Sequence, residues 1–141
     1  MLELLASAAR ASSGTSVLTK PPSPERLAGG IFLLNVTVAA TDAGDTLDVY
    51  IQQSIDEGTT YDDFIHFTQV LGNGGAKKHL AEWLAGVTVE SEMHAPQDAA
   101  LAAGVKQGPV GGLWRIKWVV VDGGAANASF TFTVGMEPIR P

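Results

Sequence analysis

The sequence predicts a mainly β fold: a single antiparallel β-sandwich or jelly-roll-like domain, with an extended N-terminal arm and room for one short helix. Three observations support this prediction. Several segments alternate apolar and polar side chains with a period of two. Short turns rich in Gly and Asp join these segments, as in sandwiches and barrels. Finally, 141 residues, 45% of them hydrophobic and 17% charged, suffice for one domain with a hydrophobic core.

The first two predicted strands are 31–38 and 47–54. Between them, 39–45 is small and polar and contains a glycine, which predicts a hairpin loop. Alternation assigns one face of each strand to the core. The residues expected to point inward are Phe32, Leu34, Val36 and Val38 from the first strand and Leu47, Val49 and Ile51 from the second.

Three further strands are predicted at 64–72, 113–122 and 128–136, with a loop at 122–127 before the last. In 113–122, the tryptophans alternate with Arg115 and Lys117, so we expect the tryptophans in the core and the two cations outside. The inward-facing residues expected in the last two strands are Trp114, Ile116, Trp118, Val120, Phe130, Phe132 and Val134.

The region from about 76 to 112 departs from this pattern. A helix and a strand both fit 76–86, and the helix is slightly favoured because Leu80, Trp83 and Leu84 have helical spacing and a glycine follows. The stretch 93–112 is rich in Ala, Gly and Pro. It predicts a long irregular excursion with one helical turn at Gln97–Ala103.

The N-terminal segment 1–27 is predicted to be an extended arm, and 28–141 to be the sandwich domain. Three prolines in 20–26 exclude a central strand and favour an extended, Pro-rich elbow. Such an arm can tuck back onto its own domain or reach a neighbouring molecule. The residues alone do not choose between these two courses.

Composition excludes several classes of partner and chemistry. The formal net charge of -6 argues against nucleic acid or an anionic membrane surface as the partner. No segment approaches the ~18–20 apolar residues of a membrane-spanning helix. The chain has no cysteine, so disulfides, thiolate nucleophiles and zinc–sulfur sites are excluded. The N-terminus has an early acidic residue and a short apolar run, so we interpret it as mature sequence rather than a signal peptide.

No catalytic residue, cofactor or metal site is predicted. The Gly-x-Ser-x-Gly elbow of a serine hydrolase is missing, and His66 is expected to be a partly buried ring bonded to the backbone. An acidic band could ligate calcium or run glycoside hydrolysis. Its scatter over loops and a strand favours a role in solubilising two turns. The band consists of Asp42, Asp45, Asp48, Asp56, Glu57, Asp62 and Asp63.

The segment 54-SIDEGTTY-61 has the most sharply patterned spacing in the chain, and it matches the Asp-box of sialidases and other propeller proteins. Ser54 and Asp56 can accept hydrogen bonds from nearby N–H groups. Gly58 supplies a positive φ, and Tyr61 offers a ring that can fold onto the adjacent strand. A propeller enzyme needs several copies and a far longer chain. We therefore predict a structural hairpin turn.

Six segments, in this order and spacing, resemble a family of small virion proteins of tailed bacteriophages. They are 2-LELLASAARASSGTS-16, 31-IFLLNVTVAA-40, 47-LDVYIQQSIDEGTTYDDF-64, 67-FTQVLG-72, 114-WRIKWVVVDGG-124 and 128-ASFTFTVGM-136. The family pattern runs from an "LLASAAR" arm through a "TLDVxIQxSxDGxTWxDF" hairpin to an "SFTFSV" strand. The resemblance covers most of the chain, except about 76–112.

This resemblance implies a non-enzymatic structural protein, most sharply a capsid decoration (cement) protein on the exterior of the virion. Such a protein binds the major capsid protein lattice and stabilises the head. It is made in the cytoplasm of the bacterial host, and the expected self-association is a homo-oligomer such as a trimer. The arm residues expected to contact capsid or sister subunit are Leu2, Leu4, Leu5, Arg10, Pro21, Pro22 and Pro24.

Other functions remain open at this point. A head–tail connector, neck or tail component would share the family resemblance but have few copies per particle. A carbohydrate-binding β-sandwich module would use exposed rings of Trp83, Trp114 or Trp118 to stack on sugars. A small hydrolase would depend on His66 or on the acidic band.

Overall fold

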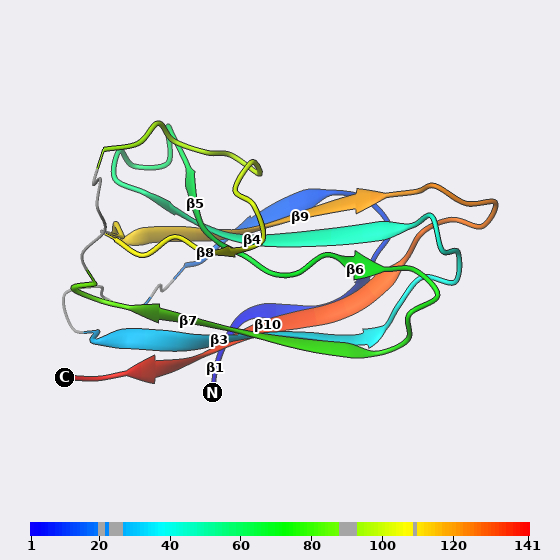
Figure 1. Cartoon of the computed structure of the whole chain (residues 1–141), viewed down its shortest axis with the longest axis horizontal. Coiled ribbons are helices and arrows are strands. Elements are labelled where there is room, and N and C mark those ends of the chain that lie inside the picture. Colours follow the sequence, from blue (N-terminus) through cyan, green and yellow to red (C-terminus); the bar gives the residue numbers. More distant parts are fainter. Residues whose placement is uncertain (20–21, 23–26, 88–92, 109) are drawn as a thin grey trace.

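In the computed structural model, the chain folds into two antiparallel β-sheets that pack face to face (Figure 1). The structure describes residues 1–19, 22, 27–87, 93–108 and 110–141. These ranges contain no helix, and hence none long and apolar enough to span a membrane. The predicted mainly β, sandwich-like fold is confirmed. The strands are β1 (Leu2–Arg10), β2 (Gly14–Val17), β3 (Gly29–Val38), β4 (Thr46–Ser54), β5 (Asp62–His66), β6 (Val70–Leu71), β7 (Lys77–Leu84), β8 (Gly104–Val105), β9 (Leu113–Val121) and β10 (Phe130–Ile139).

Sheet A has four strands in the order β1-β10-β3-β7, and sheet B has six. In sheet B the order is β2-β9-β4-β5-β8, while β6 pairs with β4 beyond the end of β5. All the pairings are antiparallel. The N-terminal strands are divided between the sheets, with β1 at one edge of sheet A and β2 at one edge of sheet B.

The core lies between the sheets, and aromatic rings fill its centre. The ring of Phe64 on β5 meets Phe32 on β3 edge-on, with 6.0 Å between centroids, and lies 5.3 Å from Trp114. Trp83 on β7 closes the cluster at 6.3 Å from Phe64. The predicted inward faces are largely confirmed, since the following residues are buried: Phe32, Leu34, Val36, Leu47, Val49, Ile51, Trp114, Ile116, Phe130, Phe132 and Val134.

Val38 is an exception to the predicted inward face of β3. Its side chain is 58% exposed. On β10, Phe132 pairs with Val36 and the adjacent Thr131 pairs with Val38, so Thr37 is an extra residue on β3. One inserted residue turns the next side chain to the opposite face of a sheet. The bulge therefore directs Val38 outward.

The slightly favoured helix at 76–86 is wrong, because this region forms strand β7. Pairing with β3 along the whole of β7 satisfies its backbone on one side. Trp83 points into the core while Leu80 points outward and is 72% exposed. The helical spacing of these apolar residues therefore does not correspond to a common buried face. The helical turn predicted at Gln97–Ala103 is also wrong, since these residues have irregular structure.

Two of the predicted connections differ in the structure. The segment 39–45 is not a hairpin loop, because β3 belongs to sheet A and β4 to sheet B. The chain crosses between the sheets there. The predicted strand 64–72 is divided into β5 and β6, which both pair with β4. Local turn signals predict a change of direction but not which strand the next segment joins.

Much of the predicted arm is extended and folds back onto the chain's own domain. Strand β1 pairs with β10, and β2 pairs with β9. Leu4 and Leu5 are buried in the core between the sheets, while Leu2 is exposed. Of the predicted elbow residues, Pro22 is half-buried, and Pro21 and Pro24 lie outside the described residues.

We expect Leu5→Ala to lower the free energy of unfolding by about 2–4 kcal/mol, because it leaves a cavity where β1 meets the core. Leu2→Ala is the matched control on the same strand and should cost less than about 1 kcal/mol, since Leu2 is 40% exposed and Leu5 only 7%. Urea denaturation of both variants measures the difference. Equal losses would contradict the placement of β1.

Candidate functional site

The segment 54–61 forms the predicted turn, and it joins β4 to β5 as a hairpin. Ser54 Oγ accepts a hydrogen bond from the Gly58 N–H at 2.9 Å and donates to Asp56 Oδ1 at 2.8 Å. Asp56 Oδ1 also accepts from the Thr60 N–H at 2.8 Å. The bond from Thr60 N–H and the Ser54 hydroxyl hold the pKa of Asp56 below its ordinary value. The polar side chains of the motif thus bond within their own turn.

Gly58 has the predicted positive φ, at 86°. A Cβ at this position would lie 3.1 Å from the Tyr61 hydroxyl and 3.4 Å from a Leu113 methyl carbon. The Tyr61 ring in turn lies under the guanidinium of Arg115 on β9, at 3.7 Å. Tyr61 therefore links the turn to a strand that is not part of the hairpin.

Part of the outer face of sheet B is covered by the irregular segment 94–101, which we call the covering segment. Tyr50 and Gln52 alternate along β4 with the core residues Val49 and Ile51 and so point to its outer face, yet both are buried. The segment 97–101 lies over this side of the sheet, and the backbone carbonyl of Leu101 bonds His66 Nδ1 at 2.7 Å. The predicted backbone bond of His66 is confirmed, and its Nε2 also bonds Asp48, at 2.8 Å.

Asp63 is the buried group that fastens this segment to the sheet. Its carboxylate accepts hydrogen bonds from the N–H groups of Ala99, Ala100 and Leu101, all at 2.9–3.0 Å. It also accepts from Gln52 Nε2 at 2.7 Å. Four donors on one fully buried carboxylate offset much of the cost of burying its charge.

A second carboxylate, Asp98, extends this network to β9. Its Oδ1 accepts from Lys117 Nζ and Gln52 Nε2, both at 2.8 Å, and pairs with Arg115 at 3.4 Å. The bonds from Lys117 and Gln52 hold the pKa of Asp98 below its ordinary value. Arg115 and Lys117 therefore point outward as predicted, but they hold the chain's own loop rather than an external ligand.

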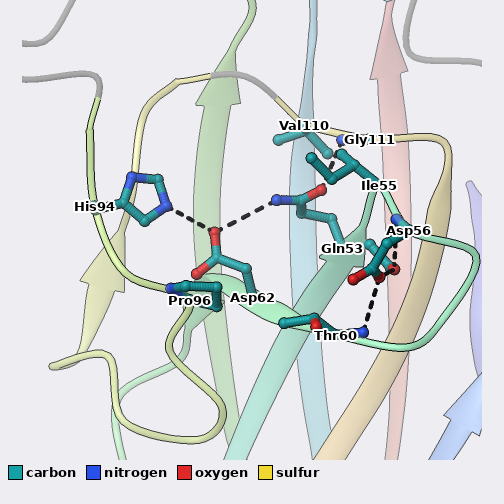
Figure 2. Close-up of a pocket in the computed structure, with 10 residues that line it drawn as sticks. Gln53, Ile55, Asp56, Thr60, Asp62, His94, Pro96, Val110 and Gly111 are labelled. Atoms are coloured by element: carbon teal, nitrogen blue, oxygen red, sulfur yellow. Dashed lines mark hydrogen bonds and ion pairs between the residues drawn. The ribbon is translucent and has the colours of Figure 1, made fainter.

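A pocket of about 410 Å³ lies between the hairpin turn and the covering segment (Figure 2). Asp62 is central to its polar side. Burial by itself raises the pKa of Asp62, but hydrogen bonds from Lys106 Nζ, the Gln97 N–H and His94 Nε2 outweigh that effect and lower it. Both oxygens of Asp62 are thus engaged within the chain. The apolar side of the pocket is formed by Ile55, Pro96 and Val110.

The acidic band is not mainly a solubilising feature. Asp45, Asp62 and Asp63 are buried, and they cap backbone and side-chain donors. In the described ranges, no three His, Asp or Glu side chains are grouped so that they could hold a metal ion. Within the same ranges, no histidine is hydrogen-bonded to a serine.

The arm residue Arg10 packs against the sandwich. Its guanidinium lies 4.9 Å from the Trp118 ring centroid and 4.6 Å from that of Phe132. It also donates to the carbonyls of Ala6 and Ala8. Arg10 therefore anchors the end of β1, and it partly covers the one tryptophan of the three that is not fully buried.

The outer face of sheet A carries an apolar row. Backbone pairing places Gly135, Leu33 and Leu80 side by side across three strands. Met1 lies against Gly135, where a Cβ would come within 2.7 Å of its sulfur, and Ile31 is the next outward residue on β3. We call these five residues the outer row. Three of its side chains, those of Met1, Ile31 and Leu80, are exposed.

Sequence comparisons leave these features without a known counterpart: no protein family, curated protein or solved structure matches the chain.

The local sequence pattern does not predict the hydrogen-bond network of Asp98, Gln52 and Asp63. One signal was present: two adjacent carboxylates follow the turn directly, so one of them had to face each side of β5. A carboxylate on a buried side requires donors, and these come from a segment about 35 residues later. The partner could not be identified from the local pattern.

We expect Gly58→Val to lower the free energy of unfolding by about 1–3 kcal/mol, because valine resists a positive φ and would crowd Tyr61. Gly112→Val is the control. Its φ is not positive and no atom lies within 4 Å of its added Cβ, so it should change stability by less than about 0.5 kcal/mol. Thermal unfolding followed by circular dichroism measures both, and an unchanged melting temperature for Gly58→Val would refute the turn assignment.

Asp63→Asn should release the covering segment, because an amide NH₂ would face N–H donors. We expect a loss of about 2–4 kcal/mol and faster amide exchange at Ala100 and Leu101. Glu57→Gln makes the same charge change at an exposed position of the same hairpin and should leave exchange unaltered. Hydrogen exchange by NMR compares the two variants. Protected amides at 100 and 101 in Asp63→Asn would contradict this role.

Proposed function

We propose that this chain is a non-enzymatic structural protein of a tailed-bacteriophage virion. In its sharpest form it is a capsid decoration protein, which binds the major capsid protein lattice on the exterior of the head and stabilises it. The observation that carries the proposal is the order and spacing of the segments that resemble the virion family. Those segments coincide with β1 to β6, β9 and β10, whereas β7 and β8 lie in the region outside the resemblance.

The outer row supports this proposal as the capsid-facing surface. Apolar area on an uncovered sheet face contributes about 25 cal/mol per Å² when a partner buries it. A small contribution per copy becomes large when many copies bind one lattice. Four of the five residues of the row lie on strands of sheet A and not on a loop, so little conformational entropy is lost when they bind.

The bonding of the polar groups is in keeping with a structural role. Asp62, Asp63 and Asp98 each bond lysine, glutamine or backbone donors of the same chain. For the carbohydrate alternative, Trp83 and Trp114 are buried and Arg10 covers part of Trp118. Two of the three tryptophans are therefore not accessible for stacking on a sugar, and the ring of the third is partly covered.

The copy number per particle tests the proposal. In purified virions of the phage that encodes this chain, quantitative mass spectrometry should find hundreds of copies, as many as a lattice requires. A count of about six or twelve would indicate a connector or neck ring instead. If the chain is missing from the virion, the proposal fails.

The capsid-facing surface is tested with particles that lack the protein. Ile31→Asp should weaken binding of the purified protein to such particles by about tenfold or more, because it places a charge in the outer row. Val121→Asp introduces the same charge on an exposed apolar residue of sheet B and should bind as the unaltered chain does. Circular dichroism first confirms that both variants fold. Equal binding by both would reject the outer row as the contact surface.

A further inference from the structure

Strand β7 forms an edge of sheet A, and part of this edge is open. Gln107 covers one end of it: its Oε1 accepts from the Leu84 N–H, and its Nε2 donates to the Glu82 carbonyl, both at 3.1 Å. Backbone groups of alternate residues in a strand point to the same side. The N–H and C=O of Lys78 and Leu80 therefore point outward, and they have no hydrogen-bond partner among the described residues.

Space is available beside this open part. A groove of about 320 Å³ runs between β7 and the short edge strand β8 of sheet B. It is bordered by the β7 residues His79 to Glu82 and by Ala103 to Val105. The Lys78–Glu82 stretch is therefore accessible to another extended chain, whereas the Gln107 side chain blocks pairing beyond Glu82.

The open stretch is complementary to itself. In an antiparallel pair centred on Leu80, the Leu80 residues of two copies lie opposite each other, and Lys78 of each copy lies opposite Glu82 of the other. These three side chains all point to the outer face of sheet A, as the alternation with buried Trp83 shows. Opposite charges directly across a strand pair attract, and like charges repel.

We propose that two copies of this chain associate through their β7 edges, paired antiparallel about a two-fold axis at Leu80. The two Leu80 residues exchange both backbone hydrogen bonds. The Glu82 N–H of each copy donates to the Lys78 carbonyl of the other. The Glu82 carbonyl keeps its bond from Gln107 and accepts the Lys78 N–H with its second lone pair.

This pairing joins the two A sheets into one continuous sheet. The outer rows of both copies then lie end to end, with Leu33 and Leu80 of one copy followed by Leu80 and Leu33 of the other. The apolar surface proposed to face the capsid is doubled in length. If the proposed function holds, the unit that binds the capsid is a two-fold dimer. The dimer itself is a property of the isolated chain and is tested without any capsid.

Charge reversal at the paired positions tests the dimer by sedimentation equilibrium of the full chain. Lys78→Glu and Glu82→Lys each place like charges opposite one another at two symmetry-related positions. Each should weaken dimerisation by about tenfold or more. The double variant restores opposite charges and should return the dissociation constant to within about threefold of the original.

Lys77→Glu is the matched control, because it makes the same charge change as Lys78→Glu on the opposite face of β7, where Trp83 of the second copy would be its neighbour. It should weaken the dimer less than Lys78→Glu. Three results would overturn the proposal: a monomer at every concentration up to about 1 mM, a trimer, or a double variant as weak as the single variants. None of them bears on the copy number in virions, so the two proposals fail separately.

Discussion

Burial of sheet B on both faces is the constraint on which the rest of the site depends. Its inner face meets sheet A, and residues 94–101 cover its outer face over β4 and β5, so polar groups on these two strands lose access to water. Each must find a partner in the chain, because an unpaired buried carboxylate is costly. Asp63 meets this requirement with three consecutive N–H groups. The irregular backbone of 97–101 is thus fixed by the buried carboxylate of Asp63, to which it donates these hydrogen bonds.

The same constraint explains why three basic residues lie close to the covering segment. Arg115, Lys117 and Lys106 are three of the nine Lys and Arg residues in the chain, and all three pair with one of two carboxylates, Asp98 in the covering segment or Asp62 beside it. Among the described residues, no segment covers the outer row on sheet A, which is flanked by Lys78 and Glu82. The two sides of the sandwich therefore differ: charged side chains pair within the chain on the sheet B side, and an apolar row borders Lys78 and Glu82 on the sheet A side.

Alternation along the chain was sufficient to predict the mainly β class and most of the buried residues, because side-chain direction in a strand is a local property. Phe32, Ile51 and Phe132 needed no knowledge of their neighbours. Pairing is not local, and there the predictions failed. The segment 39–45 has the composition of a hairpin loop but crosses between sheets, and β7 has helical spacing but is held by β3. The turn at 54–61 was predictable down to Gly58, since all its bonds are made within eight residues.

The position of β10 affects how the chain folds during synthesis. This strand comes last in the sequence, yet it lies in the interior of sheet A between β1 and β3 (Figure 1). During synthesis, β1 and β3 emerge from the ribosome without the strand that joins them. Sheet A cannot close until β10 has left the exit tunnel, and until then β1 and β3 lack the strand with which each of them pairs. Strands whose pairing waits for a distant segment form slowly and are open to aggregation in the meantime, so the pairing of β10 is the step of folding at which this risk is greatest.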